Sequence, residues 1–363
     1  MTRSKSIFLA FAGSDVSKEP DAVTEIGDGY ECWNLTKFTR ASFVAALKEK
    51  IPPINNNVLR NYEVEDGSDR YGITEEKFKK CSWGLLIPDC LDDAVVDAHA
   101  ETIFLLNLYS PSFLYPVFRA GDMGIITEQY DSLSNLNVYF PLSNQFEFFK
   151  KKEFVTFFKL LLPQSQYGTW LLPRIQTWKE EDWRLFVAAL LYSGLKEYDN
   201  RKTSFGWQRE SADMATILES LFTAGDSRNE EVTYRLRKRM AVLLSTKFSS
   251  IEDDIKDLYG ARSDFVHGRF FQQIAKDSKQ SYNNLPTPDF SVLYNQKERV
   301  RLALVAYMYL ADIVKKNPDG FGGQTSLMKI LEKAIIDIPL RNKISEEVGK
   351  IFALVPESDI RFG

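Results

Sequence analysis

Cysteine is scarce in this sequence of 363 residues, which contains only Cys32, Cys81 and Cys90. Three is an odd number, and the spacing between Cys81 and Cys90 fits neither a zinc-binding motif nor a CxxC redox pair. The cysteines therefore indicate no disulfide framework. They predict a protein of the reducing cytoplasm.

Long apolar runs are also lacking. The two most hydrophobic stretches, LFVAALLYSGL and RLALVAYMYLADIV, are well below the roughly 20 residues that span a bilayer. The apolar run at 7–12 is too short for the core of a signal peptide, and we expect it to form a strand. We therefore predict no membrane segment and no membrane partner.

Polar low-complexity tracts and internal repeats are absent too. Hydrophobic residues make up 44% and charged residues 26% of the sequence, which is typical of a soluble globular protein. The net charge is -4 and the sequence pI is about 5.6. General attraction to a polyanion is thus excluded, so contact with a nucleic acid requires a local basic patch.

The chain is long enough for two domains. Residues 1–165 alternate short apolar runs such as SIFLAFAG and SWGLLIP with turn-rich pieces such as PPINNN, which favours an α+β domain closed by a helix in KKKEFVTFFKLLLP. The apolar period then becomes helical. We predict a helical bundle at 166–330 and a helical extension at 331–363, so the predicted fold class is mainly α.

Several helices of the bundle can be placed from sequence patterns. Thr177 with Glu180, and Ser249 with Glu252, match the capping box that begins a helix. Residues 295–315 are apolar on most sides, as expected for a helix in the middle of a bundle. Three stripes are predicted to face the core: Trp183, Phe186, Val187, Leu190 and Leu191; Val232, Leu236, Met240, Leu243 and Leu244; and Ile251, Ile255, Leu258 and Phe265.

The end of the last of these helices, LYGARSDFVHGRF, carries Arg262 and one of only two histidines, His267. Five residues of an ideal helix correspond to a rotation of about 140° and a rise of about 7.5 Å, so the two side chains cannot share one face. Arg262 projects at nearly the same angle as Ile251 and Leu258, which places a permanent cation on the stripe expected to be buried.

One explanation is that Arg262 and His267 have purely structural roles. Arg262 can form an ion pair with an acidic residue such as Glu219, extend its stem at the edge of the bundle, or hold a dimer contact. His267 can end the helix, with Gly268 as the left-handed stop.

Cleavage of RNA explains the pair in another way. Arginine neutralises a phosphate, and an imidazole, whose reference pKa is about 6.5, transfers a proton at neutral pH. In RNA the 2′-hydroxyl already lies beside the scissile phosphate, so an enzyme need only deprotonate it, align it and stabilise the added negative charge. No metal or covalent nucleophile is required, and we predict no metal and no other cofactor.

These residues resemble the HEPN superfamily of helical-bundle ribonucleases, whose signature is an arginine, four to six residues, and a histidine. Here the signature reads Arg262, SDFV, His267. The stretches ATILESLF, EVTYRLRKRMAVLL and LYGARSDFVHG resemble the branch called Apea-like. The likeness covers roughly residues 180–315, and nothing extends it to residues 1–165.

The resemblance implies that Arg262 and His267 are the catalytic pair of a metal-independent endoribonuclease. It places Ser263 in the polar position that commonly follows the arginine, with Asp264 and Tyr259 as candidates for orienting the site. Members typically act as homodimers in which two motif helices meet, so a composite cleft between two chains is expected.

Many Apea-like members act in bacterial defence against phage, where a toxic RNA cleavage stops growth in abortive infection. The resemblance thus implies an RNA substrate and products with 2′,3′-cyclic phosphate and 5′-hydroxyl ends. The N-terminal domain would sense a phage-derived trigger or restrain the nuclease. The alternative is a non-catalytic module that dimerises, or that regulates a partner toxin or nucleotidyltransferase.

Other candidates are weaker. Basic side chains near the motif could follow an RNA backbone, with a solvated bundle face as the alternative. His99 has acidic neighbours, which we interpret as a solvated helix face and not as a metal site. The loop DGFGGQTS lacks the GK[ST] ending of a phosphate loop and is expected to join two helices, with Thr325 or Ser326 as cap. The candidate RNA contacts are Arg269, Arg235, Lys238 and Arg239.

Overall fold

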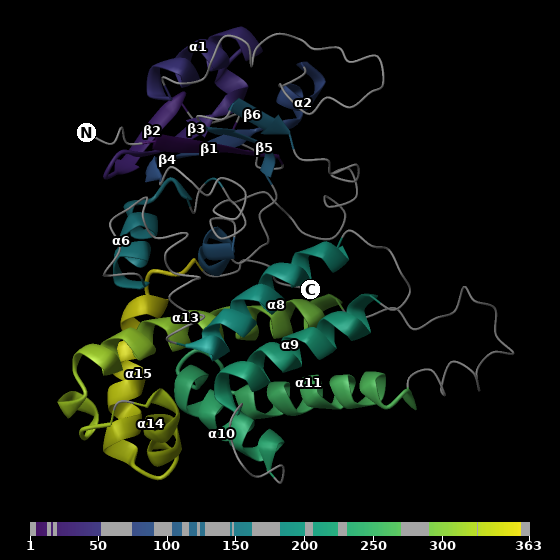
Figure 1. Cartoon of the computed structure of the whole chain (residues 1–363), viewed down its shortest axis with the longest axis vertical. Helices are drawn as coiled ribbons and strands as arrows, with labels where there is room; N and C mark the ends of the chain where they lie inside the picture. The colour runs from purple at the N-terminus through teal and green to yellow at the C-terminus, as the bar shows by residue number, and fades with distance from the viewer. Residues whose placement is uncertain are drawn as a thin grey trace, which may run out of the picture. The chain divides into compact units, whose positions relative to one another are not determined.

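The structure is a computed structural model and forms two compact units, Met1–Arg174 with Leu354–Arg361, and Ile175–Ala353 with Phe362–Gly363 (Figure 1). The division at 174/175 falls nine residues beyond the boundary predicted at 165/166. The helices expected in a C-terminal extension at 331–363 belong, as far as residue 353, to the same unit as the bundle. The residues described are 5–12, 16, 20–51, 75–90, 104–110, 116–121, 124–127, 146, 149–161, 182–199, 206–223, 231–269, 290–324 and 326–356.

An antiparallel sheet forms the centre of the first unit. Within the described residues it has six strands in the order β2-β3-β4-β1-β5-β6. The strand expected at 7–12 is confirmed as β1 in the middle of this sheet. The strands are β1 (Lys5–Phe11), β2 (Val23–Gly27), β3 (Tyr30–Asn34), β4 (Trp83–Cys90), β5 (Pro116–Gly121) and β6 (Gly124–Thr127).

Helices cover both faces of the sheet, because alternate strand residues are apolar on each side. On one face, Phe43 of α1 (Arg40–Lys50) lies 5.3 Å from the Phe8 ring, and α2 (Glu75–Lys80) packs in the same cluster. On the other face, Phe154 of α6 (Lys152–Leu161) lies 5.9 Å from the Tyr30 ring. Helix α6 confirms the helix predicted in KKKEFVTFFKLLLP.

One glycine is required by this packing. A Cβ added to Gly84 in β4 would lie 2.2 Å from the ring of Phe8 in the neighbouring strand β1, which packs on the face covered by α1. Any larger residue would displace Phe8 from the centre of the core, so only glycine fits here.

The second unit is a helical bundle, which confirms the mainly α fold with an α+β first unit. Helix α9 packs against α8, α11 and α13, while α10 packs against α11, α13, α14 and α15. The bounds are α8 (Trp183–Asp199), α9 (Gly206–Phe222), α10 (Val232–Leu244), α11 (Ile251–Val266), α13 (Phe290–Lys316), α14 (Leu327–Ala334) and α15 (Ile338–Phe352).

Helix α13 lies inside the bundle, as its apolar character predicts. Every residue from 300 to 310 is buried. The Tyr307 hydroxyl donates a hydrogen bond of 2.7 Å to the carboxylate of Asp182, just before α8. Burial, with Asp182 beside it, raises the pKa of Tyr307, so this hydroxyl stays protonated and keeps its role as a donor.

The apolar stripe predicted for α8 is wrong. Trp183 and Leu190, two of its members, are 49% and 51% exposed. The buried face has a different phase, because this helix carries apolar residues on nearly every side and the small Ala188 and Ala189 allow a close approach of its neighbour. The buried residues are Leu185, Ala188, Ala189, Tyr192 and Leu195. The capping box of Thr177 and Glu180 lies outside the described residues.

Among the helices described, none combines the length and the apolar character needed to cross a membrane.

Candidate functional site

Helix α11 carries the predicted motif and packs along α9 (Figure 1). Its predicted stripe is confirmed at Ile251, Ile255 and Leu258, which are at most 2% exposed. Phe265, the fourth member, is only partly buried. The apolar contact therefore holds the first half of the helix, and the end that carries the motif lies closer to solvent.

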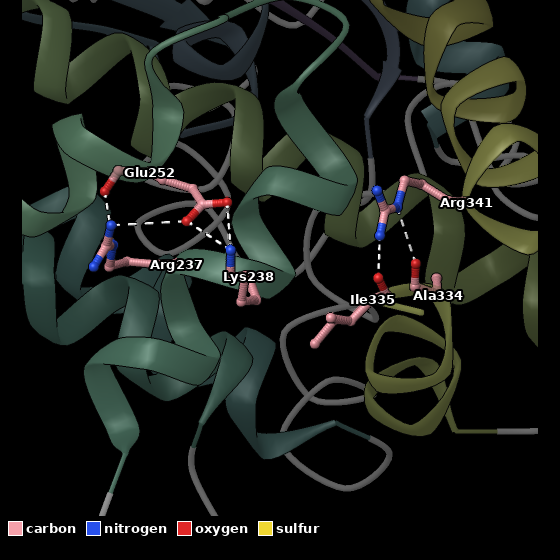
Figure 2. A network of polar contacts seen from close by, with 6 residues as sticks. All are labelled: Arg237, Lys238, Glu252, Ala334, Ile335 and Arg341. Atoms are coloured by element: carbon pink, nitrogen blue, oxygen red, sulfur yellow. Dashed lines mark hydrogen bonds and ion pairs between the residues drawn. The ribbon is translucent and has the colours of Figure 1, made fainter. Parts of the chain in front are cut away.

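The capping box predicted from Ser249 and Glu252 is wrong. The helix begins one residue later, with Ser250 as N-cap and no side-chain hydrogen bond to the backbone. Glu252 instead bridges to α10 (Figure 2): its carboxylate accepts from Lys238 at 2.9 Å, and its backbone carbonyl accepts from Nε of Arg237 at 3.0 Å. Two cations of a neighbouring helix thus engage Glu252, which takes its side chain away from the role expected in a capping box.

The last turn of α11 ends at His267. This residue is the C-cap, and Gly268 follows with φ of +68°, the left-handed conformation that glycine adopts without steric cost. The N–H of His267 donates to the Ser263 carbonyl at 3.0 Å, and the N–H of Gly268 donates to the Phe265 carbonyl at 3.1 Å. The predicted structural role of His267 and Gly268 as a helix end is confirmed.

The side chain of His267 is exposed. Within the part of the chain that the structure describes, its imidazole has no hydrogen-bond or ion-pair partner, so the backbone role at the helix end does not occupy the ring. The exposed ring is therefore within reach of a solute or of another protein chain.

Arg262 is paired with Glu219 of α9, as the structural explanation predicted. Nη2 of Arg262 lies 3.1 Å from Oε2 of Glu219, and the two side chains are 32% and 22% exposed. The Arg262 guanidinium also lies over the ring of Tyr259, 5.5 Å from its centroid. The cation expected on the buried stripe is therefore half-buried at the edge of the α9–α11 contact, where a carboxylate and an aromatic face stabilise it.

Tyr259 completes this cluster. Its hydroxyl donates a hydrogen bond to Oε1 of Glu219, so one carboxylate contacts Tyr259 through one oxygen and Arg262 through the other. Burial, and then the hydrogen bond and charge of Glu219, raise the pKa of Tyr259. The hydroxyl remains protonated across the neutral range, which preserves its hydrogen bond to Glu219.

The motif residues Arg262 and His267 are thus both accessible at one end of α11, and neither is sealed in the bundle interior. Their spacing still turns them about 140° apart on an ideal helix. One copy of the helix therefore presents two chemical groups to different directions, and no described contact joins them.

The other predicted supporting residues lie on the same exposed end. Ser263 is partly buried and its carbonyl accepts the hydrogen bond from His267. Asp264 forms an ion pair with Arg269 at 3.6 Å, in which the side chains are 55% and 67% exposed. Such an exposed pair contributes little stability, roughly 0 to 1 kcal/mol, so Arg269 can exchange this partner for another anion.

The predicted RNA contacts on α10 differ from one another. Arg239 is 3% exposed and binds the Glu332 carboxylate of α14 and the Phe222 carbonyl of α9, so its assignment as an RNA contact is wrong. Lys238 is 32% exposed and engaged by Glu252. Arg235 is partly buried.

Some candidates are not tested. His99 and its acidic neighbours lie outside the described residues, as does Thr325. Ser326 precedes α14 at the N-cap but makes no side-chain hydrogen bond there. Across the described residues, no group of three or more histidine, cysteine, aspartate or glutamate side chains is arranged to hold a metal ion.

Comparison with known proteins gave no relative: no family model, no curated protein and no solved structure matches this chain.

Proposed function

We propose that this protein is a metal-independent endoribonuclease of the Apea-like HEPN kind, with Arg262 and His267 as its catalytic pair. One observation carries the proposal. The exposed imidazole and the half-buried guanidinium lie at the same end of one helix, and the guanidinium is held by Glu219 and Tyr259 and not by a deep structural contact.

The chemistry follows from the two groups. His267 takes the proton of the 2′-hydroxyl, or donates a proton to the leaving 5′-oxygen, and Arg262 stabilises the charge that develops on the phosphate. The 2′-oxygen forms a bond to phosphorus as the bond to the 5′-oxygen breaks. The products carry a 2′,3′-cyclic phosphate and a 5′-hydroxyl, so neither water nor a metal takes part in this step.

Two copies of the chain complete the site. Because one helix turns its arginine and histidine in different directions, a homodimer in which two α11 ends meet supplies one group of each kind to a shared phosphodiester. Arg269, with an exposed and weakly paired side chain, is the neighbouring residue best suited to contact the RNA backbone.

The biological role follows from the danger of such an enzyme to its own cell. We place it in antiphage defence by abortive infection, in a reducing cytoplasm that suits the free and buried Cys32 and Cys81. The first unit would respond to a phage-derived trigger or to a regulatory partner.

Cleavage of RNA by the purified protein, with analysis of the product ends, tests the proposal. We expect cyclic phosphate and 5′-hydroxyl ends, activity that persists in EDTA, and a loss of roughly 10² to 10⁴ in rate for His267→Ala. His99→Ala is the matched control, because it removes the only other histidine. An active His267→Ala dimer, or wild-type protein that leaves diverse RNAs intact with and without phage lysate, contradicts the assignment.

A second candidate function is a non-catalytic module that dimerises or regulates a partner toxin or nucleotidyltransferase. The Arg262–Glu219 ion pair and the helix end at His267 and Gly268 favour it, because each gives the motif residue a structural purpose without RNA. In that case His267→Ala leaves RNA untouched, as the wild type does, while Arg262→Ala weakens self-association in sedimentation experiments.

A further inference from the structure

The carboxylate of Glu219 contacts two residues of α11 that lie one turn apart. Tyr259 and Arg262 are at positions i and i+3 of the helix and therefore share the face of α11 that meets α9. Glu219 accepts from the tyrosine hydroxyl through Oε1 and pairs with the guanidinium through Oε2, while the tyrosine ring lies beneath the guanidinium. The three side chains therefore fix one another.

The arginine in this cluster keeps unused hydrogen-bonding capacity. A guanidinium has five N–H donors in a rigid planar fork, and the ion pair with Glu219 engages Nη2. Among the residues described, Arg262 makes no other hydrogen bond. Its side chain is 32% exposed, so an anion from solution can reach it beside the carboxylate.

The negative charge of Glu219 also affects how Arg262 binds a phosphate. The carboxylate neutralises the cation that an incoming phosphodiester must contact, and it repels the phosphate across a short distance at a half-buried site, where screening by water is incomplete. A contact that orients the arginine therefore also weakens the first encounter with RNA.

We propose that Glu219, supported by Tyr259, is the positioning residue of the nuclease site: it holds Arg262 in the orientation needed for the reaction and in return lowers the affinity of Arg262 for the RNA phosphate. This inference rests on the proposed ribonuclease function. Glu219 does not touch the reacting atoms. It acts through Arg262, and its removal separates binding from turnover.

Binding is measured with the full chain and a fluorescent RNA carrying 2′-O-methyl groups, which cannot be cleaved by 2′-hydroxyl attack. We expect Glu219→Gln to bind this RNA about threefold to tenfold more tightly than wild type, since a half-exposed ion pair has a modest free energy. Asp257→Asn makes the same charge change at an exposed position of α11 and is expected to alter binding by less than about twofold.

Turnover is measured with cleavable RNA. We expect Glu219→Ala to lower kcat about tenfold or more while KM does not rise. Glu219→Gln keeps one oxygen acceptor, for either Tyr259 or Arg262, and is expected to recover part of kcat. Tyr259→Phe keeps the ring under the guanidinium and removes the donor to Glu219, so it should lower kcat less than Glu219→Ala. Thermal melts show whether each variant is folded at the assay temperature.

The outcomes separate this inference from the proposed function. If wild type cleaves RNA but Glu219→Gln binds the methylated RNA no more tightly than Asp257→Asn does, or if Glu219→Ala raises KM with kcat unchanged, the positioning role is overturned and the nuclease stands. If wild type binds the methylated RNA but cuts no RNA, the proposed function fails, and the binding comparison still tests whether Glu219 limits the affinity of Arg262 for phosphate.

Discussion

Replacing Arg239 with methionine tests whether its guanidinium holds three helices of the bundle together. Its Nε and Nη2 contact the Glu332 carboxylate at 3.0 and 2.6 Å, and Nη1 donates to the Phe222 carbonyl in the last turn of α9. Arg239→Met keeps an apolar stem of similar length and removes all of these donors, so the measured loss reflects the polar contacts.

The loss of free energy can be estimated contact by contact. A buried carbonyl left without its donor costs about 1 to 3 kcal/mol, and the Phe222 carbonyl lies at a helix end, where it has no N–H of its own helix to accept from. Glu332 is 46% exposed and becomes solvated when Arg239 is lost, so its share is discounted to about 1 kcal/mol or less. We therefore expect Arg239→Met to lower the free energy of unfolding by about 3 kcal/mol.

Hydrogen exchange of α10 during denaturant titration measures this loss, because the chain has two units and its unfolding need not be two-state. Arg269→Met is the matched control: its arginine is 67% exposed, and we expect a change within about 0.5 kcal/mol. Stability of Arg239→Met within that same margin of wild type refutes the reasoning. So does a variant of unchanged stability that has lost RNA affinity, which would make Arg239 an RNA contact after all.

Three further predictions concern the backbone and the thiols. Gly268→Ala should lower the free energy of unfolding by about 1 to 2 kcal/mol, because φ of +68° strains any residue with a Cβ although the space around it is open. Asparagine adopts this conformation more readily than alanine, so thermal melts in which Gly268→Asn is no more stable than Gly268→Ala would contradict this cause. Burial raises the pKa of the Cys32 and Cys81 thiols. Peptide-resolved alkylation at pH 8 should therefore modify these thiols only in unfolded protein. Rapid labelling of the native chain would contradict their burial. Above the ordinary thiol pKa of 9.0 the unfolded chain loses these protons, while the native chain keeps them. The free energy of unfolding should therefore fall as the pH rises past 9.0, which denaturant titrations at several pH values would show.

Features set by local apolar character could be predicted from the sequence. Helix α13 was correctly predicted to lie inside the bundle, because it is apolar on most sides, and β1 was correctly predicted as a strand from its short apolar run. The phase of α8 could not be derived in this way. Apolar residues surround that helix, so the choice between its stripes depends on the shape of its neighbours.

Features set by partners distant in the chain were harder to predict. Ser249 and Glu252 match a capping box, yet Glu252 binds Arg237 and Lys238 of another helix, which no local pattern reveals. Arg239 looks like part of a basic face until Glu332, 93 residues further along, covers it.

The candidate site was partly accessible to sequence reasoning. The pairing of Arg262 with Glu219 was one of the structural explanations predicted, because a cation on an apolar stripe needs a partner such as an acidic residue. The hydrogen bond from Tyr259 to the same carboxylate could not be predicted from the sequence. Only the packed helices show which oxygen of Glu219 contacts which partner.

The contact between Arg239 and Glu332 also affects how the protein folds during its synthesis on the ribosome. The 65 residues from His267 to Glu332 take about 3 to 13 s to add at roughly 5 to 20 residues per second. During that interval the helix with the motif has been synthesised, while the carboxylate that anchors α10 has not. A nascent chain therefore carries the whole motif before the contact between Arg239 and Glu332 can form, so α10 gains this anchor only after the helix with the motif has been made.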